Sequence, residues 1–162
     1  PAKNAQISAG GAFQHRVPSA LRRMAGAGCR FVNISPVRDD LDTGAAFEWI
    51  PIRPGTDTAL MLALGHVLLT EGLHDPEFLA RCATGFERFA PYLLGETDGQ
   101  PKTPAWAAAI TGVPAARITA LAREMAGART MISAGWSLQR AHHGEQPFWM
   151  ALTLACMLGQ IG

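Results

Sequence analysis

The sequence predicts an α/β fold: a doubly wound, mostly parallel sheet with helices on both faces, of the Rossmann-like or flavodoxin-like type. Three observations predict it. Short runs rich in β-branched and aromatic residues alternate with longer apolar runs of helical length. Proline and glycine stand at the borders of these runs. The run 58–71 is apolar on nearly all sides, which is typical of a helix buried between layers. Strands and helices in alternation imply parallel pairing and cover on both faces of the sheet.

Proline, glycine and capping residues set the borders in the first half of the chain. Pro18 occupies a first-turn position, where its missing N–H costs no helical hydrogen bond. Pro54 and Gly55 bend the chain after a short strand, and Thr56 or Asp57 is expected to cap the next helix. The predicted elements are a helix over 18–27, strands over 29–34 and 47–52, and a helix over 58–71.

The same kinds of signal mark the second half of the chain. Asp75 and Thr103 each precede a proline at a helix start, and Gly127 follows the last apolar position of a helix. The polar stretch 95–102 separates two helices and is expected to be the most flexible loop. The predicted elements are helices over 75–83, 86–94, 103–109, 113–127 and 145–157, and a third strand over 130–134.

Length and composition fit one globular domain spanning 1–162. The chain is 48% hydrophobic and 17% charged, and its net charge of +1 argues against an electrostatic nucleic-acid binder. The longest apolar stretches, 59–69 and 148–158, are too short to span a bilayer. Pro1 is not a natural start, so we expect a domain excised from a larger protein.

The three cysteines are compatible with a reducing or redox-neutral compartment. Cys29, Cys82 and Cys156 are odd in number, far apart in sequence and set in apolar surroundings, so we expect buried free thiols instead of a disulfide or zinc site. A cytoplasmic location is the simplest expectation. A periplasmic one stays open, because a targeting signal would lie outside this segment.

Three loops follow the predicted strands, at the edge of a parallel sheet where ligands bind. They are 33–38, 53–57 and 135–140. Together they offer hydroxyls, an amide, an aspartate, arginines and a tryptophan plane, which suits a phosphorylated purine nucleotide. The alternative for the run 53–57 is an ordinary turn with a capping aspartate, because Pro-Gly-Thr-Asp is common before helices.

Four longer runs carry a resemblance to a known family. In this order along the chain, they resemble the central part of molybdopterin oxidoreductases of the dimethyl sulfoxide reductase family. Within that family they are most similar to the branch of biotin sulfoxide reductase and trimethylamine N-oxide reductase. The runs are Trp49–Asp57, Gly95–Pro104, Gly135–Gln146 and Met157–Gly162.

The resemblance implies a central domain that holds a cofactor. In the full-length parent, two molybdopterin guanine dinucleotides (bis-MGD) would hold molybdenum, which takes oxygen from an S-oxide or N-oxide such as biotin sulfoxide, dimethyl sulfoxide or trimethylamine N-oxide. The serine that coordinates the metal in this branch lies upstream, so no metal ligand or catalytic residue is expected here. The isolated chain is therefore expected to be inactive without the rest of the parent polypeptide, and the sequence does not indicate the electron donor.

The resemblance also implies which residues contact the cofactor. The first strand-end loop would pass the guanosine, the second would recognise guanine or ribose, and the third would reach the pterin or pyrophosphate. The Asp57 carboxylate would accept from the base, and Arg140 would donate to phosphate oxygens. The implied contact residues are Asn4, close to one dinucleotide, and Ile34, Ser35, Pro36, Gly55, Thr56, Asp57, Trp136, Ser137 and Arg140.

Several polar and aromatic residues have simpler interpretations. His142 and His143, beside Glu145, are expected to give polar lining or capping instead of metal ligation. His66 is expected to be a core histidine with one hydrogen bond. The tryptophans outside the strand-end loops are expected to pack in the interior; they are Trp49, Trp106 and Trp149.

Other classes of protein fit the sequence less well. A non-catalytic nucleotide-binding or interaction domain would share the sheet layout, but would give no reason for arginine, tryptophan and glutamine in the loop 135–140. A nicotinamide dehydrogenase would need Gly-x-Gly-x-x-Gly after its first strand, which the sequence lacks. Ser137 does not stand in a Gly-x-Ser-x-Gly elbow, which argues against a hydrolase.

Overall fold

The structure is a computed structural model that describes residues 16–41 and 43–161. Asn4 therefore lies outside the described residues. The elements are α1 (Val17–Gly26), β1 (Val32–Ile34), η2 (Arg38–Asp40), β2 (Glu48–Ile50), α2 (Asp57–Thr70), α3 (Pro76–Cys82), α4 (Phe86–Leu94), α5 (Pro104–Thr111), α6 (Ala115–Ala126), η3 (Trp136–Arg140) and α7 (Gln146–Met157).

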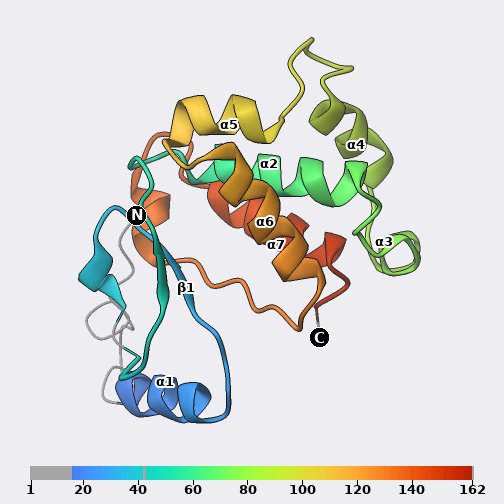
Figure 1. Cartoon of the computed structure of the whole chain (residues 1–162). Coiled ribbons are helices and arrows are strands. Elements are labelled where there is room, and N and C mark those ends of the chain that lie inside the picture. Colours follow the sequence, from blue (N-terminus) through green and yellow to red (C-terminus); the bar gives the residue numbers. More distant parts are fainter. Residues whose placement is uncertain (1–15, 42, 162) are drawn as a thin grey trace.

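Helix α2 lies at the centre of the helical part of the molecule (Figure 1). It contacts α4, α5, α6 and α7, and half of its residues are buried: Leu60, Leu62, Ala63, Leu64, Gly65, Val67 and Leu68. A helix that is surrounded in this way must be apolar on all sides, which explains why its sequence shows no polar face. The prediction that the run 58–71 forms a buried helix is confirmed.

The sheet has two parallel strands in the described part of the chain. Strands β1 and β2 pair in the register Val32–Glu48, Asn33–Trp49 and Ile34–Ile50, so the predicted parallel pairing is confirmed for them. Figure 1 shows α1 at the end of these strands that lies away from α2–α7. The described residues form a mostly helical α/β arrangement, and a doubly wound sheet with helices on both faces is not seen among them.

The predicted third strand, 130–134, is wrong for the described residues. This segment is not assigned to a strand or paired in the sheet. The Thr130 N–H donates to Gln160 Oε1, and the Thr130 hydroxyl donates to the carbonyl of Met125 at 3.0 Å, near the end of α6. These bonds tie the start of the segment to the ends of two helices instead of to a neighbouring strand.

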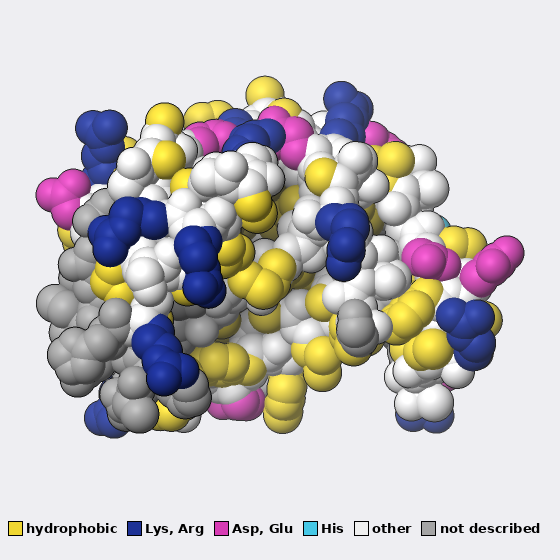
Figure 2. Space-filling view, turned by 90° about the horizontal axis from the view of Figure 1, so that it is seen from below, with side chains coloured by type: hydrophobic (Ala, Val, Ile, Leu, Met, Phe, Trp, Pro, Cys, Tyr) yellow, Lys and Arg dark blue, Asp and Glu magenta, His cyan; other side chains and the backbone are white. Residues whose placement is uncertain are grey.

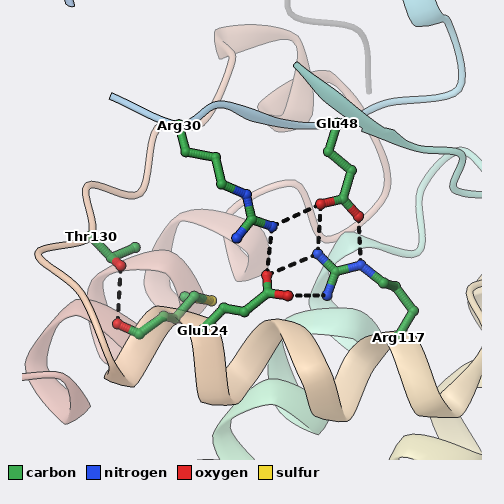
Figure 3. Close-up of polar contacts among 6 residues, drawn as sticks. Arg30, Glu48, Arg117, Glu124 and Thr130 are labelled. Carbon is green, nitrogen blue, oxygen red and sulfur yellow. Dashed lines mark hydrogen bonds and ion pairs between the residues drawn. The ribbon is translucent and has the colours of Figure 1, made fainter. Parts of the chain in front are cut away.

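An ion-pair cluster joins the sheet to α6 (Figure 3). Arg117 Nε lies 2.5 Å from Glu48 Oε1 and Arg117 Nη2 lies 3.0 Å from Glu124 Oε2. Arg30 reaches the same two carboxylates, at 2.8 Å and 2.7 Å. The hydrogen bonds from Arg117, followed by those from Arg30, lower the pKa of Glu48 against the opposing effect of burial. The cluster therefore fixes β2, and the turn that follows it, relative to α6.

The loop between α4 and α5 is tied down, although the sequence predicts it to be the most flexible. Lys102 is only 2% exposed. Its Nζ lies 2.5 Å from both Asp98 Oδ2 and the carbonyl of Gln100, and 4.3 Å from the centre of the Tyr92 ring. Gly95 allows the close approach of the returning chain, because a Cβ there would lie 2.4 Å from the backbone nitrogen of Pro101. The loop thus satisfies its own polar groups.

Large apolar side chains remain exposed on the surface. Trp149, which the sequence predicts to be a packing residue, is 62% exposed on α7, and Leu152 one turn later is also exposed. Figure 2 shows apolar side chains gathered around a hollow on one face, with lysine and arginine side chains nearby. Patches of this kind commonly mark interaction surfaces. Of the other two tryptophans, Trp106 packs against the core, whereas Trp49 stays partly exposed.

Burial also corrects the predictions for two further residue types. All three cysteines are free, but Cys29 and Cys82 are exposed and Cys156 is half-buried, so the predicted buried thiols are wrong. His66 Nδ1 is buried and has no hydrogen-bond partner among the described residues, in place of the one bond predicted. Burial lowers the pKa of His66, which favours the neutral ring.

The helices of the described part do not include a membrane span. No single helix there is long and apolar enough to cross a bilayer, and α5 and α6 reach that length only as a pair bent by 116°.

Candidate functional site

A cavity of about 630 Å³ lies between the start of α2 and the segment that joins η3 to α7. One wall comes from the turn after β2 and the first residues of α2. The other comes from residues 137–147. The cavity is thus at the carboxyl end of a parallel strand, where the sequence predicts ligand binding.

The turn after β2 is held by the end of α5. The Arg53 N–H donates to the carbonyl of Thr111 at 2.9 Å. Its guanidinium donates to the carbonyls of Ala109 and Ile110 at 2.7 Å and 3.1 Å. These are carbonyls at a helix C-terminus, which have no partners inside the helix. Arg53 therefore fixes the turn and is not directed at a ligand.

Gly55 and Thr56 shape the entry into α2. Gly55 has φ +75°, a backbone conformation that favours glycine. A Cβ there would meet nothing within 4 Å, so crowding is not the reason for a glycine at this position. The Thr56 hydroxyl donates back to the carbonyl of Arg53 at 2.7 Å. Thr56 is the N-cap residue and its side chain makes no capping hydrogen bond, so the predicted cap by Thr56 is wrong, whereas a cap by Asp57 stays a prediction. The first turn of α2, with Asp57 and Thr58, forms part of the cavity lining.

The opposite wall is a tight loop. The N–H groups of Gly144 and Gln146 donate to the carbonyls of Ala141 and His143, both at 3.0 Å. A Cβ at Gly144 would lie 2.3 Å from the carbonyl oxygen of Gln139, so only glycine fits there. His143 has φ +56°, in the left-handed region. The loop therefore has little freedom to place its side chains differently.

Three of the predicted contact residues line the cavity: Gly55, Asp57 and Ser137. Thr56, Trp136 and Arg140 belong to the same segments but do not line it. Trp136 is 73% exposed. Whether these six residues contact a cofactor stays a prediction, as it does for Asn4, which lies outside the described residues.

The end of β1 is not brought to this cavity. Ser35 is fully buried, its hydroxyl donates to Asp40, and its carbonyl accepts from the Trp49 indole N–H at 2.9 Å. The neighbouring residues Ile34 and Pro36 are half-buried. The side chain of Ser35 thus holds the loop after β1 together, and the predicted contact of 34–36 with guanosine stays a prediction.

Sequence reasoning did not assign ligand contacts to several residues that line the cavity. Thr58 and Gln146 were missed, whereas His142 and His143 line it, as polar lining would require. The described residues contain no group of three or more His, Cys, Asp or Glu side chains that could hold a metal ion. The signal that could have identified this wall is the run 142–146, which holds four polar residues and lies between the candidate loop 135–140 and the apolar run of α7.

The arrangement suits an anionic, hydrogen-bonding ligand. Backbone N–H groups at the N-terminus of a helix attract anions, and imidazole rings add further donors. Asp57, in the lining, can supply an acceptor for N–H groups such as those of a guanine edge or for ribose hydroxyls. These features, at the end of a parallel strand, define a candidate ligand-binding site in an α/β domain.

Comparison with known proteins gives the family. The sequence profile of the molybdopterin oxidoreductase family matches residues 9–162, and the chain therefore belongs to that family. Among solved structures, the chain resembles acetylene hydratase from Pelobacter acetylenicus, with a TM-score of 0.73 and 23% identity over 88% of this chain and 19% of that one. At this identity the likeness shows the fold alone. Family membership implies a cofactor of molybdenum and molybdopterin.

The similar curated proteins are S-oxide and N-oxide reductases by name. The chain is 52% identical to biotin sulfoxide reductase of Cereibacter sphaeroides over 99% of this chain and 22% of that protein. It is 49% identical to a dimethyl sulfoxide/trimethylamine N-oxide reductase of the same organism, over 91% and 18% of the two chains. It is 48% identical to trimethylamine-N-oxide reductase of Haemophilus influenzae, over 88% and 17%. The chain thus spans about a fifth of the length of these relatives.

Proposed function

We propose that residues 1–162 form a domain that binds molybdopterin guanine dinucleotide within a longer, molybdenum-dependent S-oxide or N-oxide reductase. The observation that carries the proposal is the cavity formed by the turn after β2 and the loop before α7. Both walls lie in runs whose sequence resembles this branch of the family, and Gly55, Asp57 and Ser137 line the cavity. In this proposal the chain holds the cofactor and supplies neither a metal ligand nor a catalytic residue.

The residues present fit such a cofactor. A volume of about 630 Å³ is typical of sites for small molecules and cofactors and would take part of a dinucleotide. The open space at Gly55 lets a ligand approach the backbone, and the backbone N–H groups at the start of α2 would donate to phosphate oxygens. Asp57 would accept from guanine or ribose. Arg30 and Arg117 both form ion pairs with Glu48, and these pairs hold β2 and the turn that follows it in place.

The bound cofactor would supply two-electron oxygen-atom transfer at molybdenum. The residues of this chain would orient the dinucleotide, and the isolated chain is expected to be inactive because the metal ligand would come from elsewhere in the polypeptide. The exposed apolar side chains, Trp149 and Leu152 among them, fit contact with that remaining polypeptide. We further propose that strands from it complete a doubly wound sheet, and that the protein is cytoplasmic.

Titration of the 162-residue chain with GDP and with ADP, followed by NMR chemical shifts, tests the proposal. We expect GDP to shift the signals of Gly55, Asp57 and Ser137 selectively, because guanine offers a carboxylate two adjacent donors, N1–H and N2–H, whereas adenine offers its N6 amino group beside an acceptor nitrogen. Equal shifts with ADP would favour a nucleotide-binding domain without guanine recognition. A well-folded spectrum without shifts from either nucleotide would contradict the proposal.

The same assignment is tested in the full-length protein by Asp57→Ala. This variant should lower the cofactor content more than it lowers the melting temperature, with molybdenum and guanine released from the purified protein as the measurements. Normal molybdenum loading would remove Asp57 from the site.

A further inference from the structure

His143 holds an unusual backbone conformation in the cavity wall. Among the described residues it is the one non-glycine residue with a positive φ, at +56°. A side chain with a Cβ makes this conformation unfavourable, so it persists only where the surroundings impose it. Such residues cluster at ligand sites, and this one lines the cavity beside α2.

The surrounding loop imposes the conformation. The chain must turn sharply between η3 and α7, and the buried Gly144 packs so closely under Gln139 that no other residue fits there. The carbonyl of His143 accepts from the N–H of Gln146 at 3.0 Å, which fixes the peptide that follows. A glycine at position 143 would make the same turn without strain. The turn alone therefore does not explain why the position carries an imidazole.

The His143 ring is also placed by its neighbours. Its centre lies 3.9 Å from the centre of the His142 ring, and its Nδ1 lies 3.7 Å from Glu145 Oε1. Because Nδ1 faces the Glu145 carboxylate, Nε2 is the ring nitrogen left to face a ligand, to which it donates when it carries a hydrogen. Glu145 thus orients the ring without having to touch the ligand.

The charges around the cavity favour an anion near His143. No lysine or arginine lines the cavity, so the cationic partners available from its described lining are the two histidines. On the α2 side, the cavity is lined by Asp57 and Thr58, in the first turn of the helix. A ligand with a phosphate near the histidines and a base near Asp57 would match both ends of this distribution.

We propose that His143 donates a hydrogen bond to a phosphate group of the nucleotide bound in this cavity, with Glu145 as its positioning residue. This inference rests on the proposed function and deepens it, because it assigns the phosphate end of the ligand to the loop before α7. The strained backbone then places an imidazole donor at a position where the turn itself would favour glycine.

The test compares GDP with guanosine on the 162-residue chain, by NMR titration near pH 6, for the wild type and three variants. His143→Gly removes the ring and relieves the strain, whereas His143→Asn keeps a polar side chain that tolerates the left-handed region. His142→Asn is the matched control, because it changes the neighbouring ring on an ordinary backbone. Thermal melting is measured for each variant.

We expect His143→Gly to melt at the same temperature as the wild type or higher, and to bind GDP about tenfold more weakly, as for one lost charge-assisted hydrogen bond. Its affinity for guanosine should not change, because guanosine has no phosphate. His143→Asn should recover part of the loss, and His142→Asn should lose less than His143→Gly.

Two results would overturn the inference while leaving the proposed function intact. One is GDP binding by His143→Gly that equals that of the wild type. The other is a lower melting temperature with equal losses for GDP and guanosine, which would show that the ring only supports the loop. If GDP causes no shifts at Gly55, Asp57 or Ser137 in the wild type, the proposed function fails, and this inference fails with it.

Discussion

Two polar loops of this chain look alike in sequence and differ in what their polar groups do. The loop 95–104 and the loop 135–146 each link apolar helical segments, and each lies in a run that resembles the same family. In the first, Lys102 is buried and bound to Asp98 and to the Gln100 carbonyl. In the second, no hydrogen bond or ion pair joins the Arg140 side chain to another described residue, and the two histidines line a cavity.

The difference separates a structural loop from a candidate binding loop. A loop that satisfies its polar groups internally has few left for a ligand, whereas one that presents them to a cavity retains them. Both loops resemble the same family, and this resemblance does not distinguish a loop that stabilises the fold from one that binds a ligand. Only the burial and the hydrogen bonds show that the Lys102 ammonium is bound within the loop 95–104, and only the structure shows that 135–146 forms a wall of the cavity.

The largest effect is expected from Gly95→Ala in the first loop. Gly95 has φ +80°, and the new Cβ would lie 2.4 Å from the Pro101 nitrogen, so the free energy of unfolding should fall. Positive φ and crowding together predict a loss of about 2–4 kcal/mol. Urea denaturation of the 162-residue chain measures it.

Gly99→Ala is the matched control for that change. Gly99 lies in the same loop at φ +72°, but a Cβ there meets nothing within 4 Å. Strain without crowding predicts a loss of about 1–2 kcal/mol. Equal losses of unfolding free energy for Gly95→Ala and Gly99→Ala would show that the backbone at Pro101 moves to accommodate the new Cβ. The loop would then be less firmly held than its contacts indicate. GDP binding should be unchanged in both.

Gly144→Ala is the counterpart in the second loop and should give an intermediate loss of stability. A Cβ there would lie 2.3 Å from the Gln139 carbonyl oxygen, which predicts a loss of about 1–3 kcal/mol as the loop shifts. Because this loop forms a wall of the cavity, GDP binding should weaken as well. If stability falls and GDP binding does not, the comparison between the two loops is wrong.

The smallest effect is expected outside both loops, at the ion-pair cluster. Contact with Arg117, and then with Arg30, lowers the pKa of Glu48. The stabilisation is therefore complete above the ordinary glutamate pKa and is lost as the pH falls through the lowered value. Glu48→Gln should cost about 0.5–1 kcal/mol at neutral pH, since the side chains are partly exposed, and should flatten the loss of stability in acid.

Glu96→Gln serves as the control for this change, because Glu96 is exposed and has no ion pair among the described residues. Melting temperatures from neutral pH to about pH 3, below the ordinary glutamate pKa, compare the two variants. An acid profile for Glu48→Gln that matches the wild type would show that the cluster does not tie the sheet to α6.

Local signals explain what could be predicted from the sequence. The apolar run of α2, the prolines at helix starts and the β-branched content of β1 act within a few residues, and the elements they predict are present. The placement of Gly55 and Asp57 at the end of β2 follows from such signals too, since a strand, a turn and a helix in that order bring the turn to the sheet edge.

The sequence by itself thus determined the helices, the parallel pairing of two strands, and the turn that opens α2. The tertiary structure decided the rest: that 130–134 is anchored to helix ends instead of a strand, that Ser35 and Lys102 are buried, that Cys29 and Trp149 are exposed, and that His142 and His143 share a cavity with Asp57. The physical reason is that propensity and periodicity depend on neighbours in sequence, whereas burial and hydrogen-bond partners depend on segments far apart in the chain.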